Sequence, residues 1–379
     1  MNVIFTCGGT GGHIMPAISV ANIWKERYPD SNILFIGARN SMEEELVPKA
    51  GYALKTIDAY GMRRGFSMKA IKRNILAVRC VLASVPACKK IMKEFRPDVV
   101  IGTGGYASYP ALLAAHQLGI PTCVHEANAV PGRTTKMAAQ WADKVLVCFE
   151  ECRKYYKHPE RVEVVGMPVR REFIFSNRED ARKELKLDDR PVVVSAFGSQ
   201  GAKAMNQLMA ELFALEQKAG FPFQHIHAVG SYGWSWMPEL VKEKGVDLSK
   251  TEDIRMVQYI YNMPTVVAAA DVFIGRAGAS TCNEIAASGT PCILIPSPNV
   301  TNNHQEMNAR VLSDNGGAVL VLEKECTAQL IFDELMALSQ DKEKASVMRA
   351  ALLKMAVPDS AERLCDIMYS LANDARQGR

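Results

Sequence analysis

Two short apolar runs in this chain each end in a glycine-rich turn, and this pattern narrows the possible folds more than any other feature. VIFT at residues 3–6 leads into GGTGGH at 8–13, and PVVVSAF at 191–197 leads into GSQGA at 198–202. Continuous apolar runs of this length are typical of buried parallel strands, and glycines directly after a strand let the backbone turn sharply into a helix. The pair predicts two α/β units of similar construction.

Further strand-length apolar runs alternate with helical stretches in both halves, which indicates parallel sheets covered by helices on both faces. We predict an α/β fold with two Rossmann-like, doubly wound parallel-sheet domains at residues 1–165 and 166–355. The first helix is expected from about Pro16, and a last helix at 356–379 is expected to pack back on the first domain. A ligand should bind in the cleft between the domains, at the carboxyl ends of their strands.

Cysteine usage and apolar patterning bear on the compartment. The ten cysteines are scattered without a C-x-x-C pair or zinc spacing, which favours free thiols in a reducing compartment. We find no secretory pattern at the N-terminus and no run near the roughly 18–20 apolar residues that a spanning helix needs. We therefore expect a soluble or peripheral cytoplasmic protein.

The charge is unevenly distributed. Residues 1–165 hold 22 Lys and Arg against 14 Asp and Glu, a net +8, while the remainder holds 23 against 27, a net −4. Most of the excess lies between Gly61 and Arg96. Within this window, a predicted helix at 68–95 has cations such as Lys72 and Arg73 interleaved with apolar residues such as Ile75 and Leu82. A basic amphipathic helix of this kind indicates an anionic membrane surface, although a core helix with a solvated basic face has the same pattern. Nucleic acid is not expected, because no recognition motif or set of stacking aromatics accompanies the charge.

The two glycine turns suit anion binding, because backbone N–H groups at a helix N-terminus attract negative charge. Thr10, Gly11 and Gly12 form the first candidate site, and Ser199, Gln200 and Gly201 form the second. A dinucleotide-binding site is disfavoured, since residue 14 is Ile where the G-x-G-x-x-G spacing needs glycine and no acidic residue follows the second strand at 37–39. Two anion sites across a cleft would suit a donor and an acceptor that both carry a diphosphate.

A third cluster reads RAGASTCNE at 276–284, where Ala277, Gly278 and Ala279 begin a predicted helix. Glu284 lies one to two turns into that helix and could accept hydrogen bonds from both hydroxyls of a ribose, although an exposed surface glutamate has the same pattern. The following loop carries several amide side chains, including Gln305, which suits recognition of sugar hydroxyls.

Read together, the motifs resemble a known family. GGTGGH at 8–13, GTGGYASYPALLAA at 102–115, HEANAVPGR at 125–133, GMPVR at 166–170, FGSQGA at 197–202, RAGASTCNEIAASGTPCILIP at 276–296 and HQEMNA at 304–309 occur in the order found in the MurG family. The members of this family are bacterial cell-wall transferases that convert lipid I to lipid II with UDP-N-acetylglucosamine (UDP-GlcNAc). The resemblance covers nearly the whole chain. It implies a GT-B fold, inversion at the anomeric centre, no metal or other cofactor, and peripheral attachment to the cytoplasmic face of the inner membrane.

The resemblance also implies roles for individual residues. Asn128 and Gln305 match contacts of the GlcNAc hydroxyls, Glu284 matches the ribose ligand, and Tyr106 falls on the acceptor side. Other positions that match donor contacts are Thr10, Gly11, Gly12, Arg170, Ser199, Gln200, Gly201, Ala277, Gly278 and Ala279. Two positions depart from the family pattern: Ala127 replaces the glutamine of HEQN, and Met167 replaces the asparagine of GNP.

Inverting transfer needs a base for the acceptor hydroxyl, and His13 at the end of the first glycine turn is the first candidate because imidazole titrates near neutrality. Glu126 is the second candidate. Two other functions remain open at this point: an isomerase similar to the UDP-GlcNAc 2-epimerases, and a lipid-diphosphate-binding module without catalysis.

Overall fold

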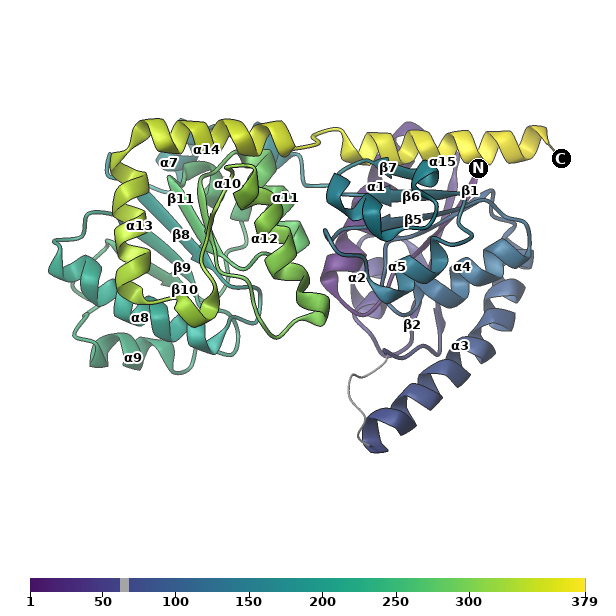
Figure 1. Ribbon diagram of the computed structural model, residues 1–379, viewed down its shortest axis with the longest axis horizontal. Helices are drawn as coiled ribbons and strands as arrows, with labels where there is room; N and C mark the ends of the chain where they lie inside the picture. Colours follow the sequence, from purple (N-terminus) through teal and green to yellow (C-terminus); the bar gives the residue numbers. More distant parts are fainter. Residues whose placement is uncertain (62–67, 379) are drawn as a thin grey trace. The chain divides into compact units, whose positions relative to one another are not determined.

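The computed structural model describes residues 1–61 and 68–378, except for the side chains of residues 69–71, 73, 74, 76–78 and 82. The chain divides into two compact units (Figure 1). Unit 1 comprises Met1–Val169 together with Val357–Arg379, and unit 2 comprises Arg170–Ala356.

Unit 1 is built on a seven-stranded sheet in the order β3-β2-β1-β4-β5-β6-β7, in which all paired strands are parallel. Its strands are β1 (Asn2–Thr6), β2 (Asn32–Ala38), β3 (Ala53–Ile57), β4 (Val99–Gly102), β5 (Thr122–Glu126), β6 (Lys144–Val147) and β7 (Val162–Val164). Its α-helices are α1 (Gly11–Arg27), α2 (Glu43–Lys49), α3 (Met68–Phe95), α4 (Ser108–Gln117), α5 (Arg133–Ala138) and α15 (Ser360–Gln377).

Unit 2 repeats this plan with a six-stranded parallel sheet in the order β10-β9-β8-β11-β12-β13. Its strands are β8 (Val192–Ala196), β9 (Gln224–Ala228), β10 (Ile254–Val257), β11 (Val272–Gly275), β12 (Cys292–Leu294) and β13 (Val319–Leu320). Its α-helices are α6 (Glu172–Phe175), α7 (Arg178–Glu184), α8 (Lys203–Lys218), α9 (Met237–Glu243), α10 (Met263–Ala269), α11 (Ala279–Ser288), α12 (His304–Asp314), α13 (Ala328–Gln340) and α14 (Lys342–Met355). The predicted fold class, two parallel α/β domains, is confirmed.

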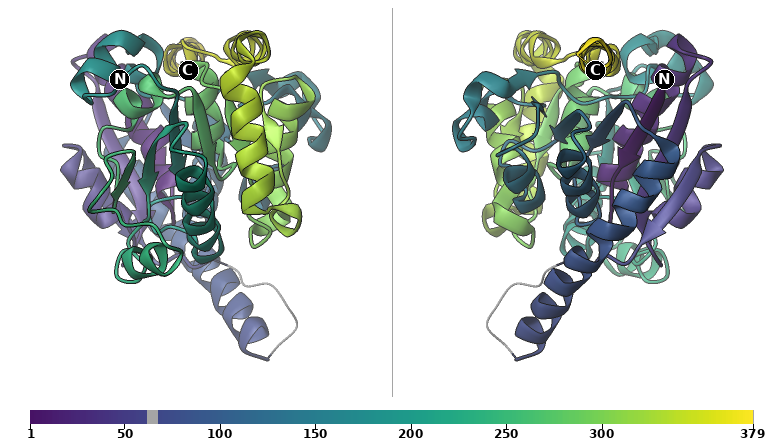
Figure 2. Two further views of the ribbon diagram at one scale, coloured as in Figure 1. Left: turned by 90° about the vertical axis from the view of Figure 1, so that its left-hand side faces the viewer. Right: turned by 90° about the vertical axis from the view of Figure 1, so that its right-hand side faces the viewer.

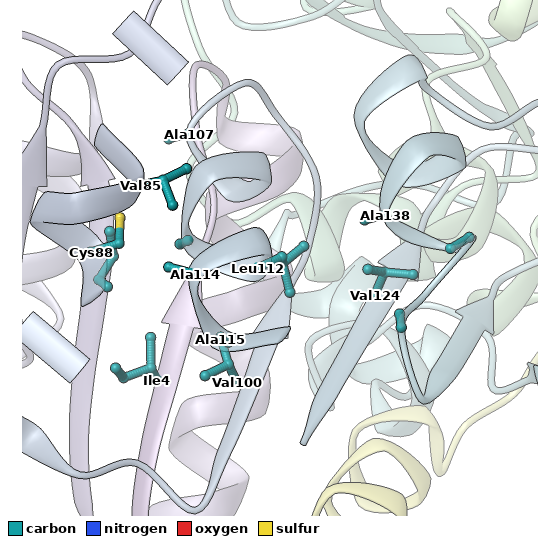
Figure 3. Close-up of a cluster of buried hydrophobic side chains, with 14 of the residues drawn as sticks. Ile4, Val85, Cys88, Val100, Ala107, Leu112, Ala114, Ala115, Val124 and Ala138 are labelled. Atoms are coloured by element: carbon teal, nitrogen blue, oxygen red, sulfur yellow. The ribbon is translucent and has the colours of Figure 1, made fainter. Parts of the chain in front are cut away.

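The sheet of unit 1 has a hydrophobic core on each face. Alternate residues of β1 supply both cores, since Val3 and Phe5 belong to one and Ile4 to the other. Figure 3 shows the core around Ile4, which lies with Val100 beside the small residues of α4. Burial on both faces explains why these strands read as continuous apolar runs.

The core on the other face of the sheet includes a helix from the far end of the chain. Leu364, Cys365, Met368 and Ala372 of α15 pack with α1 residues, among them the buried Trp24. An ion pair of 2.6 Å between Arg27 and Asp366 fixes the edge of this contact. Unit 1 therefore contains the last segment of the chain as part of its core.

The structure differs from the predicted secondary structure of unit 1 in two details. Helix α1 begins at Gly11 instead of near Pro16, because the Thr10 carbonyl already accepts the N–H groups of His13 and Ile14. Pro16 is the sixth residue of α1, past the first turn where proline is best tolerated, and the helix continues through it without the hydrogen bond that its missing N–H would make. The short edge strand β7 was not predicted, since three residues are too few to show a period.

Candidate active site

The predicted functional residues of both units follow the carboxyl ends of parallel strands. In unit 1 they follow β1, β4 and β5, and in unit 2 they follow β8, β11 and β12. Each unit therefore gathers its candidates along one edge of its sheet, where ligands bind in open α/β folds.

The first glycine turn of unit 1 is packed against the turn after β4. Gly9 has φ of +86°, and a Cβ atom there would lie 2.6 Å from Cε1 of Tyr106. A Cβ atom on Gly105 would lie 2.0 Å from the carbonyl oxygen of Gly8. Both turns therefore need glycine. Thr10 is exposed as the N-cap residue of α1, and Gly11 and Gly12 are its first two residues.

His13 is held between the same two turns. Its Nδ1 lies 3.1 Å from the carbonyl oxygen of Thr103, and the Thr103 hydroxyl donates to the His13 carbonyl at 2.7 Å. A carbonyl only accepts hydrogen bonds, so Nδ1 carries the proton in the neutral ring and Nε2 carries the lone pair. The backbone thus selects the tautomer whose Nε2 can take a proton.

Glu126, at the end of β5, is buried and organises the loop that follows it. Its Oε1 accepts hydrogen bonds from the backbone N–H and the side-chain amide of Asn128, at 3.0 and 3.1 Å, and its Oε2 accepts the Gly132 N–H at 2.9 Å. The carboxyl group therefore fixes the position of Asn128.

The neighbouring His125 is fully enclosed, and burial lowers its pKa below the usual range. Its Nε2 lies 2.9 Å from the carbonyl oxygen of Gly166. A neutral ring in this position ties the end of β5 to the last segment of the first half of the chain.

The predicted basic helix is α3, whose first half extends away from the sheet of unit 1 (Figure 2). Met68, Lys72, Ile75 and Arg79 are exposed at spacings of four, three and four residues, so they share one face. Two other predicted membrane contacts, the side chains of Arg73 and Leu82, lie outside the described residues. No helix within the described part of the chain is long and apolar enough to cross a bilayer.

In unit 2, the second glycine turn is fixed by the loop after β9. Ser231 and Tyr232 donate their N–H groups to the carbonyl oxygens of Ser199 and Gln200, at 3.3 and 3.1 Å. Gly201 has φ of +77°, and a Cβ atom there would lie 2.1 Å from the carbonyl oxygen of Val229. Ser199 and Gln200 are exposed on this rigid turn, directly before α8.

A hollow next to this turn brings several candidates together. Ser199, Thr281 and Glu284 line it, so residues from the β8–α8 turn and from α11 face one space. The rest of its wall consists of Phe173, Ala196, Gly198, Ala228, Gln258, Tyr259, Ile260, Met263, Val267, Phe273 and Ile285. A mostly apolar hollow with a few converging polar groups is suited to a small organic ligand.

Glu284 has an unusual environment in this wall. Burial raises the pKa of its carboxyl group from 4.5 to about 7, while the nearby cation of Arg170 acts in the opposite direction. Arg170 lies over the ring of Phe173, with 5.1 Å between its Cζ and the ring centroid. Glu284 is thus a carboxyl group that changes charge near neutral pH.

The remaining donor candidates follow β11 and β12. Asn308 donates its side-chain amide to the carbonyl oxygen of the buried Ala277 at 3.1 Å, which fixes the turn through Gly278 and Ala279. Gln305 lies in the first turn of α12, and its Oε1 accepts the Ser297 N–H at 2.8 Å. This bond points the oxygen toward the backbone and leaves the amide N–H groups as the donors for a ligand.

Sequence reasoning missed most of the wall of the hollow in unit 2 and a buried glutamate of unit 1. Phe173, Gln258–Ile260 and Met263 come from segments without a recognisable motif, and only the position of residues 258–260 directly after β10 could have indicated them. The missed glutamate is Glu43, which is buried and accepts a hydrogen bond from the Gly9 N–H of the first glycine turn.

Comparison with known proteins gives consistent matches over the whole chain. The model of the glycosyltransferase family 28 N-terminal domain matches residues 3–147, and that of the C-terminal domain matches residues 192–364. A UDP-N-acetylglucosamine--N-acetylmuramyl-(pentapeptide) pyrophosphoryl-undecaprenol N-acetylglucosamine transferase from a Thermoanaerobacter species is 40% identical over 98% of this chain and 100% of its own. The transferase of the same name from Acetivibrio thermocellus is 38% identical over the full length of both chains. Among solved structures, MurG from Acinetobacter baumannii superposes with a TM-score of 0.79 at 25% identity, over 97% of this chain and 99% of that chain.

Proposed function

Since the chain belongs to glycosyltransferase family 28, and within it to the N-acetylglucosamine transferases named above, we propose that it moves N-acetylglucosamine from UDP-GlcNAc to lipid I and so forms lipid II. The hollow lined by Ser199, Thr281 and Glu284 is the single structural observation that carries this proposal, because it combines an anion-binding turn with a carboxyl group in one space.

Unit 2 is the proposed donor side. The diphosphate of UDP-GlcNAc binds at the N–H groups of Ser199 and Gln200, where the start of α8 favours negative charge. The Gly201 N–H donates to the Gly198 carbonyl oxygen at 3.0 Å and so holds the turn in shape. The carboxylate of Glu284 accepts the ribose hydroxyls, and the Gln305 amide donates to the GlcNAc hydroxyls. Arg170 and the turn at Ala277–Ala279 supply further contacts, and the same cradle stabilises the diphosphate as it leaves.

Unit 1 is the proposed acceptor side, with His13 as the base. Its Nε2 takes the proton of the acceptor hydroxyl while that oxygen attacks the anomeric carbon, the bond from this carbon to the phosphate oxygen breaks, and UDP leaves with the electron pair. The configuration at the anomeric carbon is inverted in this single displacement. We also keep Thr10, Gly11 and Gly12 as proposed contacts of the donor.

The hydrogen bonds of Glu126 give it a structural role beside its place as the second candidate base. Both Glu126 oxygens accept N–H groups of the loop at 128–132. We therefore propose that Glu126 orients Asn128 for the GlcNAc hydroxyls.

The test measures UDP release and product mass with UDP-GlcNAc, with and without a short-chain lipid I analogue. Transfer predicts UDP release only with the acceptor, whereas an isomerase alters UDP-GlcNAc alone and a binding module releases nothing. His13→Ala should lower kcat by about 10²- to 10⁴-fold, as for removal of a general base. His158→Ala, at a partly exposed histidine of the same unit, is the control and should leave kcat unchanged.

We further propose that the protein binds the anionic, cytoplasmic face of the plasma membrane through α3. The exposed face of Met68, Lys72, Ile75 and Arg79 combines cations with large apolar side chains on the part of α3 that extends from unit 1 (Figure 2). Each cation near an anionic surface contributes about 1 kcal/mol, and the apolar side chains add burial in the interface.

Vesicle flotation tests this attachment. The double variant Lys72→Glu, Arg79→Glu should float at least tenfold less with phosphatidylglycerol vesicles than the wild type does, and neither protein should float with phosphatidylcholine alone. Lys354→Glu, a charge change at an exposed residue of α14, is the control. Equal flotation of the double variant and the control would exclude this face of α3.

A further inference from the structure

The first glycine turn is built on a buried glutamate. Glu43 is the first residue of α2, and none of its surface is exposed. Its Oε1 accepts the N–H groups of Gly9 and Ala38, both at 3.2 Å, and its Oε2 accepts the hydroxyl of Ser41. The side chain thus joins the turn after β1 to the turn after β2.

This arrangement needs a reason, because burying a carboxylate is costly unless it is fully hydrogen-bonded. Gly9, Ala38 and Ser41 all act as donors toward Glu43, so the group is satisfied as an acceptor. A leucine of similar size could fill the same space without that cost. The role of the carboxyl group is therefore to fix the position of the Gly9 N–H.

The position of Gly9 is transmitted to the candidate base through close contacts. A Cβ atom on Gly8 would lie 3.2 Å from Oε1 of Glu43, and one on Gly105 would lie 2.0 Å from the Gly8 carbonyl oxygen. A Cβ atom on the adjacent Gly104 would lie 2.7 Å from Nδ1 of His13. Glu43, the first glycine turn, the turn after β4 and the His13 ring therefore form one packed series.

We propose that Glu43 is a positioning residue for His13 and for the acceptor side of the reaction. This inference rests on the proposed function. The length of the Glu43 side chain lets its carboxyl group accept hydrogen bonds from Gly9 and Ala38 together. These bonds fix the turn against which His13 packs.

Two variants separate reach from charge. Glu43→Asp keeps the charge but withdraws the oxygens by one methylene, whereas Glu43→Gln keeps the length, and the Ser41 hydroxyl can turn to accept from its amide. We expect Glu43→Asp to lower kcat/KM for the lipid I analogue by about 10- to 100-fold, since displacements near 1 Å have effects of this size. Glu43→Gln should stay within about threefold of the wild type. Glu44→Asp, at the exposed neighbour on the same helix, is the matched control.

Calorimetric binding of UDP to each full-length variant provides the second measurement. The proposed contacts of the ribose and the diphosphate lie in unit 2, and only Thr10, Gly11 and Gly12 are proposed to contact the donor from unit 1. The Kd for UDP should therefore change much less than kcat/KM does in Glu43→Asp. Wild-type kinetics in Glu43→Asp, or a parallel loss of UDP affinity, would overturn the inference, as would loss of activity in Glu43→Gln with retention in Glu43→Asp. If Glu43→Asp does not fold, the kinetics of Glu43→Gln decide alone: a loss above tenfold contradicts positioning by length. A wild type that does not transfer GlcNAc refutes the proposed function instead.

Discussion

The ionised carboxylate of Glu284 should favour substrate binding and disfavour folding. Both effects should therefore depend on pH. Its pKa rises from 4.5 to about 7 because the folded protein buries the carboxyl group. Folding therefore favours the protonated form. The unfolded chain loses this proton near pH 4.5, so stability decreases as the pH rises from there toward 7 and stays reduced above it.

The size of this effect follows from the pKa rise. A rise from 4.5 to about 7 corresponds to at most about 3 kcal/mol, since partial exposure lets water screen part of the charge. Glu284→Gln removes the titration. The variant should thus gain up to about 3 kcal/mol over the wild type at pH 8 and nothing comparable at pH 4.5.

Urea unfolding at both pH values measures the effect, with Trp234 and Trp236 as fluorescent reporters in unit 2. Glu239→Gln, at an exposed glutamate of the same unit, is the control and should shift neither curve. A gain that is equal at pH 4.5 and pH 8 would refute the assignment of the pKa rise to burial of Glu284.

The same titration should govern UDP binding. The ribose needs the ionised carboxylate, so the Kd of the wild type should rise about tenfold from pH 8 to pH 6. In Glu284→Gln, affinity should be weaker by about 10- to 100-fold, the range for a hydrogen bond to a charged group, and its pH dependence should be only that of the diphosphate. Unchanged UDP affinity in this variant would remove Glu284 from the proposed ribose site.

Two further changes test the geometry of unit 2. Gly201→Ala should lower the free energy of unfolding in urea by more than about 3 kcal/mol, because it adds a Cβ atom 2.1 Å from a carbonyl oxygen at positive φ. Gly198→Ala adds a Cβ atom that meets no other atom and should lower it by about 1 kcal/mol. Equal losses would contradict the steric argument. Burial lowers the pKa of His227 to about 3, so the unfolded chain binds a proton near pH 6.5 that the folded unit does not bind. The free energy of unfolding should therefore fall by up to about 5 kcal/mol between pH 7 and pH 3. In His227→Gln the corresponding urea midpoints should depend less on pH, and an unchanged slope would exclude this histidine as a cause.

The strands and glycine turns could be predicted because each depends on local sequence. A strand buried on both faces, such as β1 or β8, is apolar at most positions, and a turn at positive φ requires glycine at Gly9 or Gly201. The hollow of unit 2 could not be predicted. Its wall is assembled from α6, α10, α11 and several strand ends, and adjacency among these elements is a property of the sheet order.

Glu43 shows where such reasoning stops even for a polar residue. The sequence has three consecutive glutamates, Glu43, Glu44 and Glu45, at the start of a helix, where acidic residues are common because they oppose the helix dipole. Composition and helix propensity do not distinguish the three glutamates from one another. The structure buries the first completely and exposes the other two, because only residue 43 faces Gly37, whose missing side chain leaves room for its Cβ atom. The direction of α2 relative to the first glycine turn determines which glutamate is buried. This direction arises from the packing of β1 beside β2, which no local sequence pattern contains.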